Sequence, residues 1–273
     1  MTVAEAIRAA AERLAPISDT ARLDAELLMA HARGVSRSEL LLRHMRDPAP
    51  AGFPALVERR AGHEPVAYIT CWTEFYGLTL RVTPATLIPR GDSETLVTVA
   101  LERAGPEGRA IDLGTGTGAL LLTVLAERAG WQGVGIDASP AALAVAEGNA
   151  AATGLAERAA FRLRDWHEAG WADDLGTFDL ILCNPPYVET GAALDRQVRD
   201  FEPASALFAG PEGLDDYRVL IPQLRGLMNP GAAAILEIGA NQAESVGALA
   251  QASGFATQLR RDLAGRPRAL VLR

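Results

Sequence analysis

The chain has 273 residues, of which 49% are hydrophobic and 22% charged, enough for one large domain or for a large and a small one. No run approaches the roughly 18 consecutive apolar residues that a membrane-spanning helix needs, and the N-terminus lacks the basic-then-apolar order of a signal peptide. We therefore expect a soluble, cytoplasmic protein that does not act at a membrane.

Charge and cysteine content bear on whether the protein binds nucleic acid, forms disulfides or holds a metal. The net charge is −8 at pH 7, all 26 basic residues are arginine, and most of the acidic excess lies after residue 75. An acidic protein repels a phosphate backbone at long range, so the composition disfavours a nucleic-acid substrate without excluding it. The two cysteines, Cys71 and Cys183, indicate neither a disulfide framework nor a metal site.

The N-terminal segment predicts a small bundle of helices. Apolar side chains recur at helical spacing through residues 3–15, and residues 19–33 continue this pattern up to Gly34, a residue type that commonly ends helices. Residues 36–45 and 54–62 complete the set. The apolar face of the first helix consists of Val3, Ala6, Ile7, Ala10 and Leu14.

A hairpin follows the helices and marks the boundary between two domains. Leu78, Leu80 and Val82 alternate with other residues at the period of two that is typical of a strand or hairpin. We therefore divide the chain into a helical domain, a hairpin-containing linker and a larger domain, at residues 1–72, 73–90 and 91–273.

The larger domain alternates between strands and helices. Its first helix, at 93–105, has Asp92 or Ser93 as its cap, and a later helix at 140–154 has Ser139 as its cap. This alternation predicts an α/β fold with a doubly wound, mostly parallel sheet covered on both faces. Strands are expected at 110–114, 133–137, 159–165, 178–184, 232–239, 255–262 and 268–273, and further helices at 119–130, 214–228 and 241–253.

A glycine-rich loop after the first of these strands indicates a ligand site. Gly114, Gly116 and Gly118 allow the backbone to approach a ligand closely at a helix N-terminus. The spacing also fits a dinucleotide fingerprint. However, Asp112 stands just before the loop, and an acid there favours a cationic ligand over a pyrophosphate. S-adenosylmethionine carries an ammonium group and a sulfonium centre, so we interpret Asp112 as a partner for its methionine end.

Two further strand ends complete a predicted nucleoside site. Asp137 ends the second strand, where a carboxylate can accept hydrogen bonds from both ribose hydroxyls. Asp165 and Trp166 follow the third strand and are candidates to hold adenine by hydrogen bonding and stacking. Open α/β sheets bind ligands at the carboxyl ends of their strands, and we therefore expect S-adenosylmethionine as the cofactor.

The stretch Asn184-Pro185-Pro186-Tyr187 ends the fourth strand, beside the predicted cofactor site. Proline has no N–H, so the Asn184 side-chain oxygen and the Pro185 carbonyl can each accept one hydrogen of a substrate –NH2 group. The two acceptors would hold a weakly nucleophilic, planar amine in line with the sulfonium methyl, and Tyr187 would stack on it. This predicts direct methyl transfer without a covalent intermediate, which leaves Cys183 without a role.

These residues specify a planar amine but not which one. An exocyclic amine of a DNA or RNA base and the side-chain amide of glutamine both satisfy the chemistry. A base would have to be flipped and held by basic or aromatic surface. The negative net charge and the 5% aromatic content argue against that substrate.

Stretches that flank these motifs carry a more specific resemblance. Besides "DLGTGTG" and "NPPY", the chain contains "DAELLMAHARGVSR", "RRAGHEPVAYIT", "LIPRGDSETL", "FEPASALFAGPEGLDDYR" and "LEIGANQ". Nearly end to end, it resembles the bacterial release-factor glutamine methyltransferases, the HemK/PrmC family. The "NPPY" motif is shared by many amino-methyltransferases, whereas the flanking set is much more discriminating.

The resemblance implies a Rossmann-like class I methyltransferase that uses S-adenosylmethionine to methylate N5 of the glutamine in the Gly-Gly-Gln loop of peptide-chain release factors. It implies that the helical domain helps to dock the release factor in a transient complex, and we expect a monomer. Implied substrate contacts run across Asn184, Pro185, Pro186 and Tyr187. Implied cofactor contacts are Gly114, Thr115, Gly116, Thr117, Gly118, Asp137, Trp166 and Asn184.

The chain departs from the family pattern at two positions in the connecting region. Gly91 stands where the family usually has proline, and Cys71 where it usually has glycine. Arg90 and Glu94, in the same region, are candidates for fixing the entrance of the site.

Four alternative functions remain open at this point. The first is glutamine methylation of a ribosomal protein, and the second is amino-methylation of a nucleic acid. The third is a non-catalytic release-factor binder that retains a cofactor pocket, and the fourth is a nicotinamide-dependent oxidoreductase.

Overall fold

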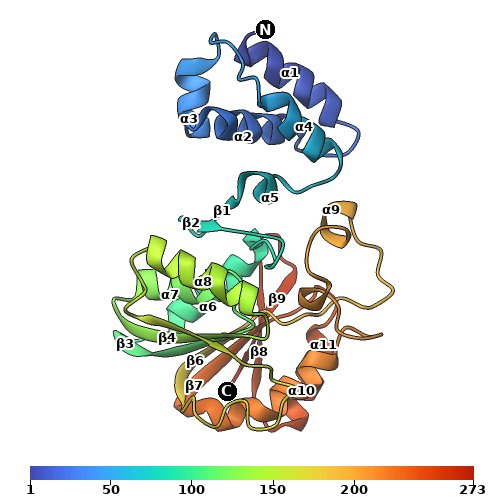
Figure 1. The fold of residues 1–273 in the computed structure, drawn as a ribbon. Helices are drawn as coiled ribbons and strands as arrows, with labels where there is room; N and C mark the ends of the chain where they lie inside the picture. Colours follow the sequence, from blue (N-terminus) through green and yellow to red (C-terminus); the bar gives the residue numbers. More distant parts are fainter. The chain divides into compact units, whose positions relative to one another are not determined.

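The computed structural model describes residues 1–273, and the chain forms two compact units (Figure 1). The helical unit comprises Met1–Trp72 together with Leu194–Phe201. The α/β unit comprises Thr73–Ala193 and Glu202–Arg273. None of the helices has the length and apolar character needed to cross a bilayer.

Most helices of the helical unit pack around one apolar cluster. The prediction for its first helix is confirmed, because the five residues of the expected apolar face are all buried. Gly34 ends the second helix in the left-handed conformation, with φ 67°, as glycine readily does. The helices are α1 (Val3–Leu14), α2 (Ala21–Arg33), α3 (Arg37–Glu39), α4 (Phe53–Ala61), α5 (Val66–Thr70) and α9 (Arg196–Arg199), with a π-helical turn at Leu40–His44.

Cys71 ends α5 in a conformation that favours glycine. Its φ is 65°, in the left-handed region where a Cβ atom is strained. The glycine that the family usually carries at this position would adopt the same backbone without that strain. The departure is therefore tolerated here at a local cost.

The α/β unit contains a seven-stranded sheet and a separate two-stranded hairpin. The strand order in the sheet is β5-β4-β3-β6-β7-β9-β8, and β9 alone runs opposite to the other six strands. The expected doubly wound sheet and hairpin are both present. The strands are β1 (Trp72–Phe75), β2 (Leu78–Arg81), β3 (Glu107–Leu113), β4 (Gly130–Asp137), β5 (Ala159–Leu163), β6 (Phe178–Cys183), β7 (Met228–Glu237), β8 (Thr257–Arg261) and β9 (Pro267–Leu272).

Helices cover both faces of this sheet, as Figure 1 shows. One apolar layer lies under α6 (Glu94–Arg103), α7 (Ala119–Glu127) and α8 (Pro140–Ala152), and it includes Phe75 and Leu80 of the hairpin. The other layer lies under α10 (Asp215–Leu224) and α11 (Ala243–Ala252). The order of the strands reverses between β3 and β6, and such a switch point leaves a crevice at the carboxyl ends of the strands.

Candidate functional site

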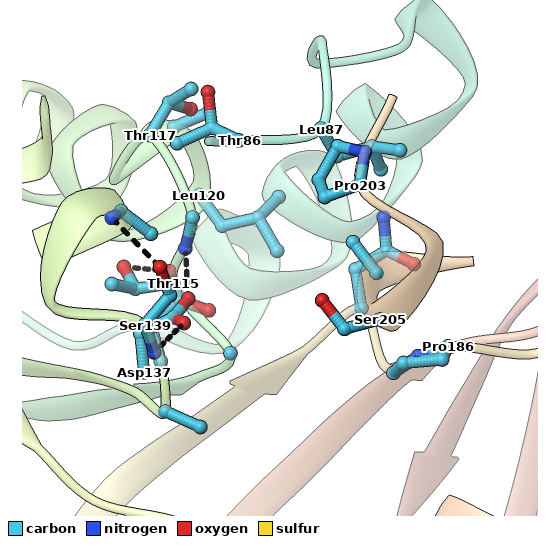
Figure 2. A pocket seen from close by; sticks show the side chains of 18 of the residues that line it. Thr86, Leu87, Thr115, Thr117, Leu120, Asp137, Ser139, Pro186, Pro203 and Ser205 are labelled. Atoms are coloured by element: carbon cyan, nitrogen blue, oxygen red, sulfur yellow. Dashed lines mark hydrogen bonds between the residues drawn. The ribbon is translucent and has the colours of Figure 1, made fainter. Parts of the chain in front are cut away.

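A cavity of about 510 Å³ opens at this switch point, and all of its lining residues belong to the α/β unit. Figure 2 shows two sides: a glycine-loop side with Thr115, Asp137 and Ser139, and an Asn184 side with Pro186, Pro203 and Ser205. Gly118, Pro185 and Tyr187 are not among the lining residues. Those predicted from the sequence that do line it are Asp112, Gly114, Thr115, Gly116, Thr117, Asp137, Asp165, Trp166, Asn184 and Pro186.

The glycine loop has the backbone conformation that its composition predicts. Gly114, Gly116 and Gly118 all have positive φ, at 73°, 55° and 82°. The N–H groups of Gly114 and Thr115 both donate to the Ile136 carbonyl, at 2.9 and 2.8 Å, which ties the loop to the end of β4. A Cβ atom on Gly114 would lie only 3.1 Å from the Trp166 ring. The loop is therefore closely packed as well as conformationally demanding.

Asp112 is a buried carboxylate, and one of its oxygens has no hydrogen-bond partner. Its side chain is 1% exposed, Oδ2 accepts a hydrogen bond from the Thr115 hydroxyl at 2.7 Å, and Oδ1 has no partner. Burial raises its pKa to about 7. An unpaired buried acceptor is costly unless a ligand completes it. A ligand ammonium group would supply both the missing donor and the opposite charge, so Asp112 fits the methionine end of S-adenosylmethionine.

Asp137 joins the glycine loop to the start of α8. One of its oxygens accepts from the Gly116 N–H and the other from the Ser139 N–H, both at 2.9 Å. Ser139 in turn caps α8, as expected, by accepting from the Ala142 N–H at 3.2 Å. Each carboxylate oxygen retains a second acceptor position. Asp137 can therefore hold the loop in place and still accept hydrogen bonds from ribose hydroxyls.

The Trp166 side chain is held in place by Asp216, a residue that the sequence analysis did not identify. Its indole N–H donates at 2.8 Å to Asp216, in the first turn of α10, and burial raises the pKa of that carboxyl. Asp165 instead accepts from the His167 N–H at 2.9 Å. The only sequence signal for Asp216 was an acidic pair at the start of a predicted helix, which is an ordinary feature of helix N-termini.

The Asn184 corner lies across the cavity from the glycine loop. The Asn184 side chain is half-buried, lines the cavity and makes no hydrogen bond within the chain. Pro186 also lines it, whereas Pro185 is buried behind it. Tyr187 packs its ring into the apolar layer under α10, and its hydroxyl donates to Glu237 at 3.2 Å. The amide of Asn184 is thus a free polar group on this side, as is the Ser205 hydroxyl.

Cys183 is enclosed in the core beneath the corner. It is fully buried in the layer under α10 and α11, and it is absent from the cavity lining. Burial raises the pKa of its thiol well above the ordinary value, which disfavours the thiolate that a nucleophile needs.

The segment before α6 is joined to the segment after Phe201 by a carboxylate. Glu202 is buried, accepts from the Ile88 N–H at 3.2 Å and pairs with the Arg90 guanidinium. Arg90 thus anchors one edge of the cavity wall. Glu94 faces the hairpin instead, where it accepts from the Tyr76 N–H at 3.0 Å.

Fold and cavity together define the class of this protein: it contains an α/β methyltransferase domain. Residues 105–212 match a family model described as a methyltransferase domain, and residues 5–70 match one described as a PrmC N-terminal domain. Curated relatives with one shared name extend the match over the full chain. The "Release factor glutamine methyltransferase" of Cereibacter sphaeroides is 43% identical over 100% of this chain and 99% of its own length. That of Moorella thermoacetica is 40% identical over 99% and 98%. The chain belongs to the release factor glutamine methyltransferase family.

Solved structures match the α/β fold alone. A methyltransferase from Pyrococcus furiosus superposes with a TM-score of 0.52 at 16% identity, over 72% of this chain and 89% of that one. This similarity supports the architecture of the sheet and its helices.

Proposed function

We propose that this protein transfers a methyl group from S-adenosylmethionine to the side-chain amide nitrogen of the glutamine in the Gly-Gly-Gln motif of peptide-chain release factors. One observation carries the proposal beyond family membership. A single cavity brings the glycine loop, the orphaned oxygen of Asp112 and the free amide of Asn184 together.

The glycine-loop side would hold the cofactor. Asp112 would pair with its ammonium group, Asp137 would accept from its ribose hydroxyls, and Trp166 would stack on adenine, with Asp165 near its edge. When bound, S-adenosylmethionine supplies an electrophilic methyl group on a sulfonium centre. Supporting contacts of the loop backbone would come from Gly114, Thr115, Gly116, Thr117 and Gly118.

The Asn184 side would hold the acceptor amide. A carboxamide nitrogen is a poor nucleophile because its lone pair is delocalised into the carbonyl group. The Asn184 side-chain oxygen would accept one N–H of the substrate, and the Pro185 carbonyl the other, which orients the nitrogen and favours the positive charge that develops on it. Pro186 would shape the wall against which the planar amide lies, and Tyr187 would support that wall from the apolar layer under α10. The proton leaves after the new bond forms, so no general base is needed before attack.

The helical unit would contribute to docking of the release factor, and the enzyme would act as a monomer in a transient complex. Support for this assignment comes from the match of residues 5–70 to the PrmC N-terminal domain model. An overall charge of −8 disfavours direct binding of nucleic acid.

Mass spectrometry of a release factor incubated with the enzyme and S-adenosylmethionine tests the proposal. We expect a gain of one methyl group on the glutamine of the Gly-Gly-Gln motif, and no gain when that glutamine is replaced by alanine. A parallel incubation with ribosomal proteins and with RNA covers the alternatives. Methylation of either of those substrates, but not of the release factor, would overturn the assignment.

A further inference from the structure

Glu237, at the end of β7, is a buried carboxylate that no step of the proposed reaction uses. Its side chain is 1% exposed and lies in the α/β unit next to the Asn184 corner. The side chain accepts two hydrogen bonds from residues far away in the sequence. Oε2 accepts from the Ser93 hydroxyl at 2.5 Å, and Oε1 accepts from the Tyr187 hydroxyl at 3.2 Å.

These two donors belong to different segments of the α/β unit. Ser93 precedes α6 and lines the cavity itself, whereas Tyr187 ends the Asn184 corner. The sequence predicts Asp92 or Ser93 as the cap of α6; Ser93 occupies the cap position, but its side chain makes no capping hydrogen bond and donates to Glu237 instead. A residue type suited to a local helix cap thus serves a contact with a residue 144 positions away.

Tyr187 is held at its backbone as well as at its ring. The Gln242 side-chain amide donates to the Tyr187 carbonyl at 3.0 Å and to the Gly213 carbonyl at 3.1 Å. A Cβ atom on Gly213 would collide with the same Tyr187 carbonyl, so this approach requires glycine. Glu237 and Gln242 come from one stretch, "LEIGANQ", and together they fix both ends of Tyr187.

The main chain of Glu237 is secured independently of its carboxylate. Its carbonyl accepts from the Tyr217 hydroxyl at 2.6 Å, and it pairs with Ala269 in the ladder between β7 and β9. A side-chain substitution therefore changes the contacts to Ser93 and Tyr187 and leaves the strand itself in register.

We infer that Glu237 is a positioning residue for methyl transfer: its carboxylate joins Ser93 to Tyr187 and thereby sets the Asn184 corner relative to the start of α6, where Ser93 lines the cavity. The inference rests on the proposed function. A displacement of about 1 Å in a reacting group is enough to lower a rate by about 10²-fold. A carboxylate that links the start of α6 to the corner that carries Asn184 controls a displacement of this kind.

The ionised form of Glu237 is the one that accepts from both hydroxyls. Burial raises its pKa to about 7, while the Ser93 hydroxyl and the nearby Arg268 guanidinium act in the opposite direction. As the pH falls through about 7, protonation removes one of the two acceptor oxygens and loosens the contact. The charged or titratable groups that act on Glu237 from neighbouring elements are Asp92, Tyr187, Tyr217, Cys183 and Arg268.

Substitutions at Glu237 separate positioning from a purely structural role. Glu237→Leu removes both acceptors, and we expect kcat on the release factor to fall by about 10²-fold while the Kd for S-adenosylmethionine stays within about threefold. Glu237→Gln keeps the shape but, like the protonated acid, only one acceptor, so its kcat should match the low-pH value of the wild type and lie above that of Glu237→Leu. It should also abolish the fall in kcat as the pH drops through 7, measured at saturating cofactor. Tyr187→Phe keeps the ring, removes one donor, and should lower kcat by about tenfold.

Matched controls make each outcome decisive. Glu244→Gln is the same chemical change on the exposed face of α11 and should leave kcat and its pH profile unchanged. The inference is overturned if Glu237→Gln keeps the wild-type pH profile, or if the losses in Glu237→Leu and Tyr187→Phe fall entirely on cofactor Kd. Failure of the wild-type enzyme to methylate the release factor would instead refute the proposed function. If Glu237→Leu does not fold, Tyr187→Phe and Glu237→Gln carry the test.

Discussion

The two sides of the cavity are built in opposite ways. In the glycine loop the hydrogen bonds connect residues that are close in the sequence. Asp112 and Thr115 are three residues apart, and Gly116 and Asp137 are 21 residues apart. On the Asn184 side the hydrogen bonds connect residues that are far apart in the sequence. Ser93 and Glu237 are 144 positions apart, and Ile88 and Glu202 are 114 positions apart. One strand–loop–helix–strand segment makes the glycine loop itself, and only its supports, such as Asp216 at Trp166, come from further away. The Asn184 side is held by contacts between distant segments.

We therefore expect the glycine-loop side to determine cofactor affinity and the Asn184 side to determine kcat. A local segment can form a ligand site without the rest of the fold, because its contacts do not depend on distant segments. The long-range side positions the acceptor, and substitutions there should change kcat more than cofactor affinity. The following predictions are ordered by the size of the expected effect.

Asn184→Ala should have the largest effect, because it removes the one free amide that faces the cavity. We expect kcat to fall by about 10²–10³-fold, the usual cost of losing one preorganised polar contact to the reacting group. Cofactor affinity, measured by calorimetry, should change much less. Asn241→Ala, at an exposed asparagine, is the control. Equal losses in kcat and in cofactor affinity would show that cofactor binding and positioning of the acceptor are not separated between the two sides.

Asp112→Asn should mainly affect the other side. The substitution removes a buried charge but keeps an acceptor for Thr115, and we expect cofactor Kd to rise by about 10- to 100-fold. Because Asp112 has a pKa of about 7 in the free protein, cofactor binding by the wild type should weaken as the pH falls below 7. In Asp112→Asn this pH dependence should be reduced. Asp19→Asn, at an exposed aspartate, should leave both Kd and its pH dependence unchanged.

The Asp112 carboxyl also affects the free energy of unfolding of the cofactor-free protein, and this effect has the opposite pH dependence to cofactor binding. Folding raises the pKa of Asp112 from 3.8 to about 7, so the folded state binds more protons than the unfolded state between these values. Its contribution to the free energy of unfolding is therefore largest at low pH and is lost as the pH rises toward 7. Denaturant unfolding of wild type and Asp112→Asn across this range would measure it; identical slopes against pH would contradict the assignment.

Asn149→Ala should destabilise the protein rather than slow the chemistry directly. Asn149 is 1% exposed; its side chain accepts from the Arg81 N–H at 2.7 Å and donates to the carbonyls of Arg81 and Thr117, at 3.0 and 2.9 Å. It thus ties the hairpin to the glycine loop. Leaving these groups unpaired should lower the free energy of unfolding by about 1–3 kcal/mol. Urea unfolding measures this loss, and an unchanged transition midpoint would contradict it.

Asp216→Ala should have the smallest effect of the four substitutions. It leaves the Trp166 indole N–H without its acceptor, and cofactor Kd should rise by a few fold, equivalent to about 1 kcal/mol. Asp215→Ala removes an acid from the same turn of α10 without touching Trp166, so it controls for effects on the helix. Equal effects of the two substitutions would assign the change to the helix and not to Trp166.

By itself, the sequence determined the parts of this protein whose contacts are local. Helical periodicity identified the buried face of α1, glycine at positions 114, 116 and 118 identified the ligand loop, and acids at strand ends identified Asp112 and Asp137. Each of these signals arises because neighbouring residues impose backbone conformation on one another.

The tertiary structure alone decided the roles of Glu237, Glu202 and Asp216. Each is an acid whose sequence neighbours give no sign of its partner, because that partner lies between 50 and 144 residues away. Ser93 illustrates the reason most clearly. Its local context indicates a helix cap, which would accept a hydrogen bond from the first turn. The buried Glu237 carboxylate requires a donor instead, and the Ser93 hydroxyl supplies it.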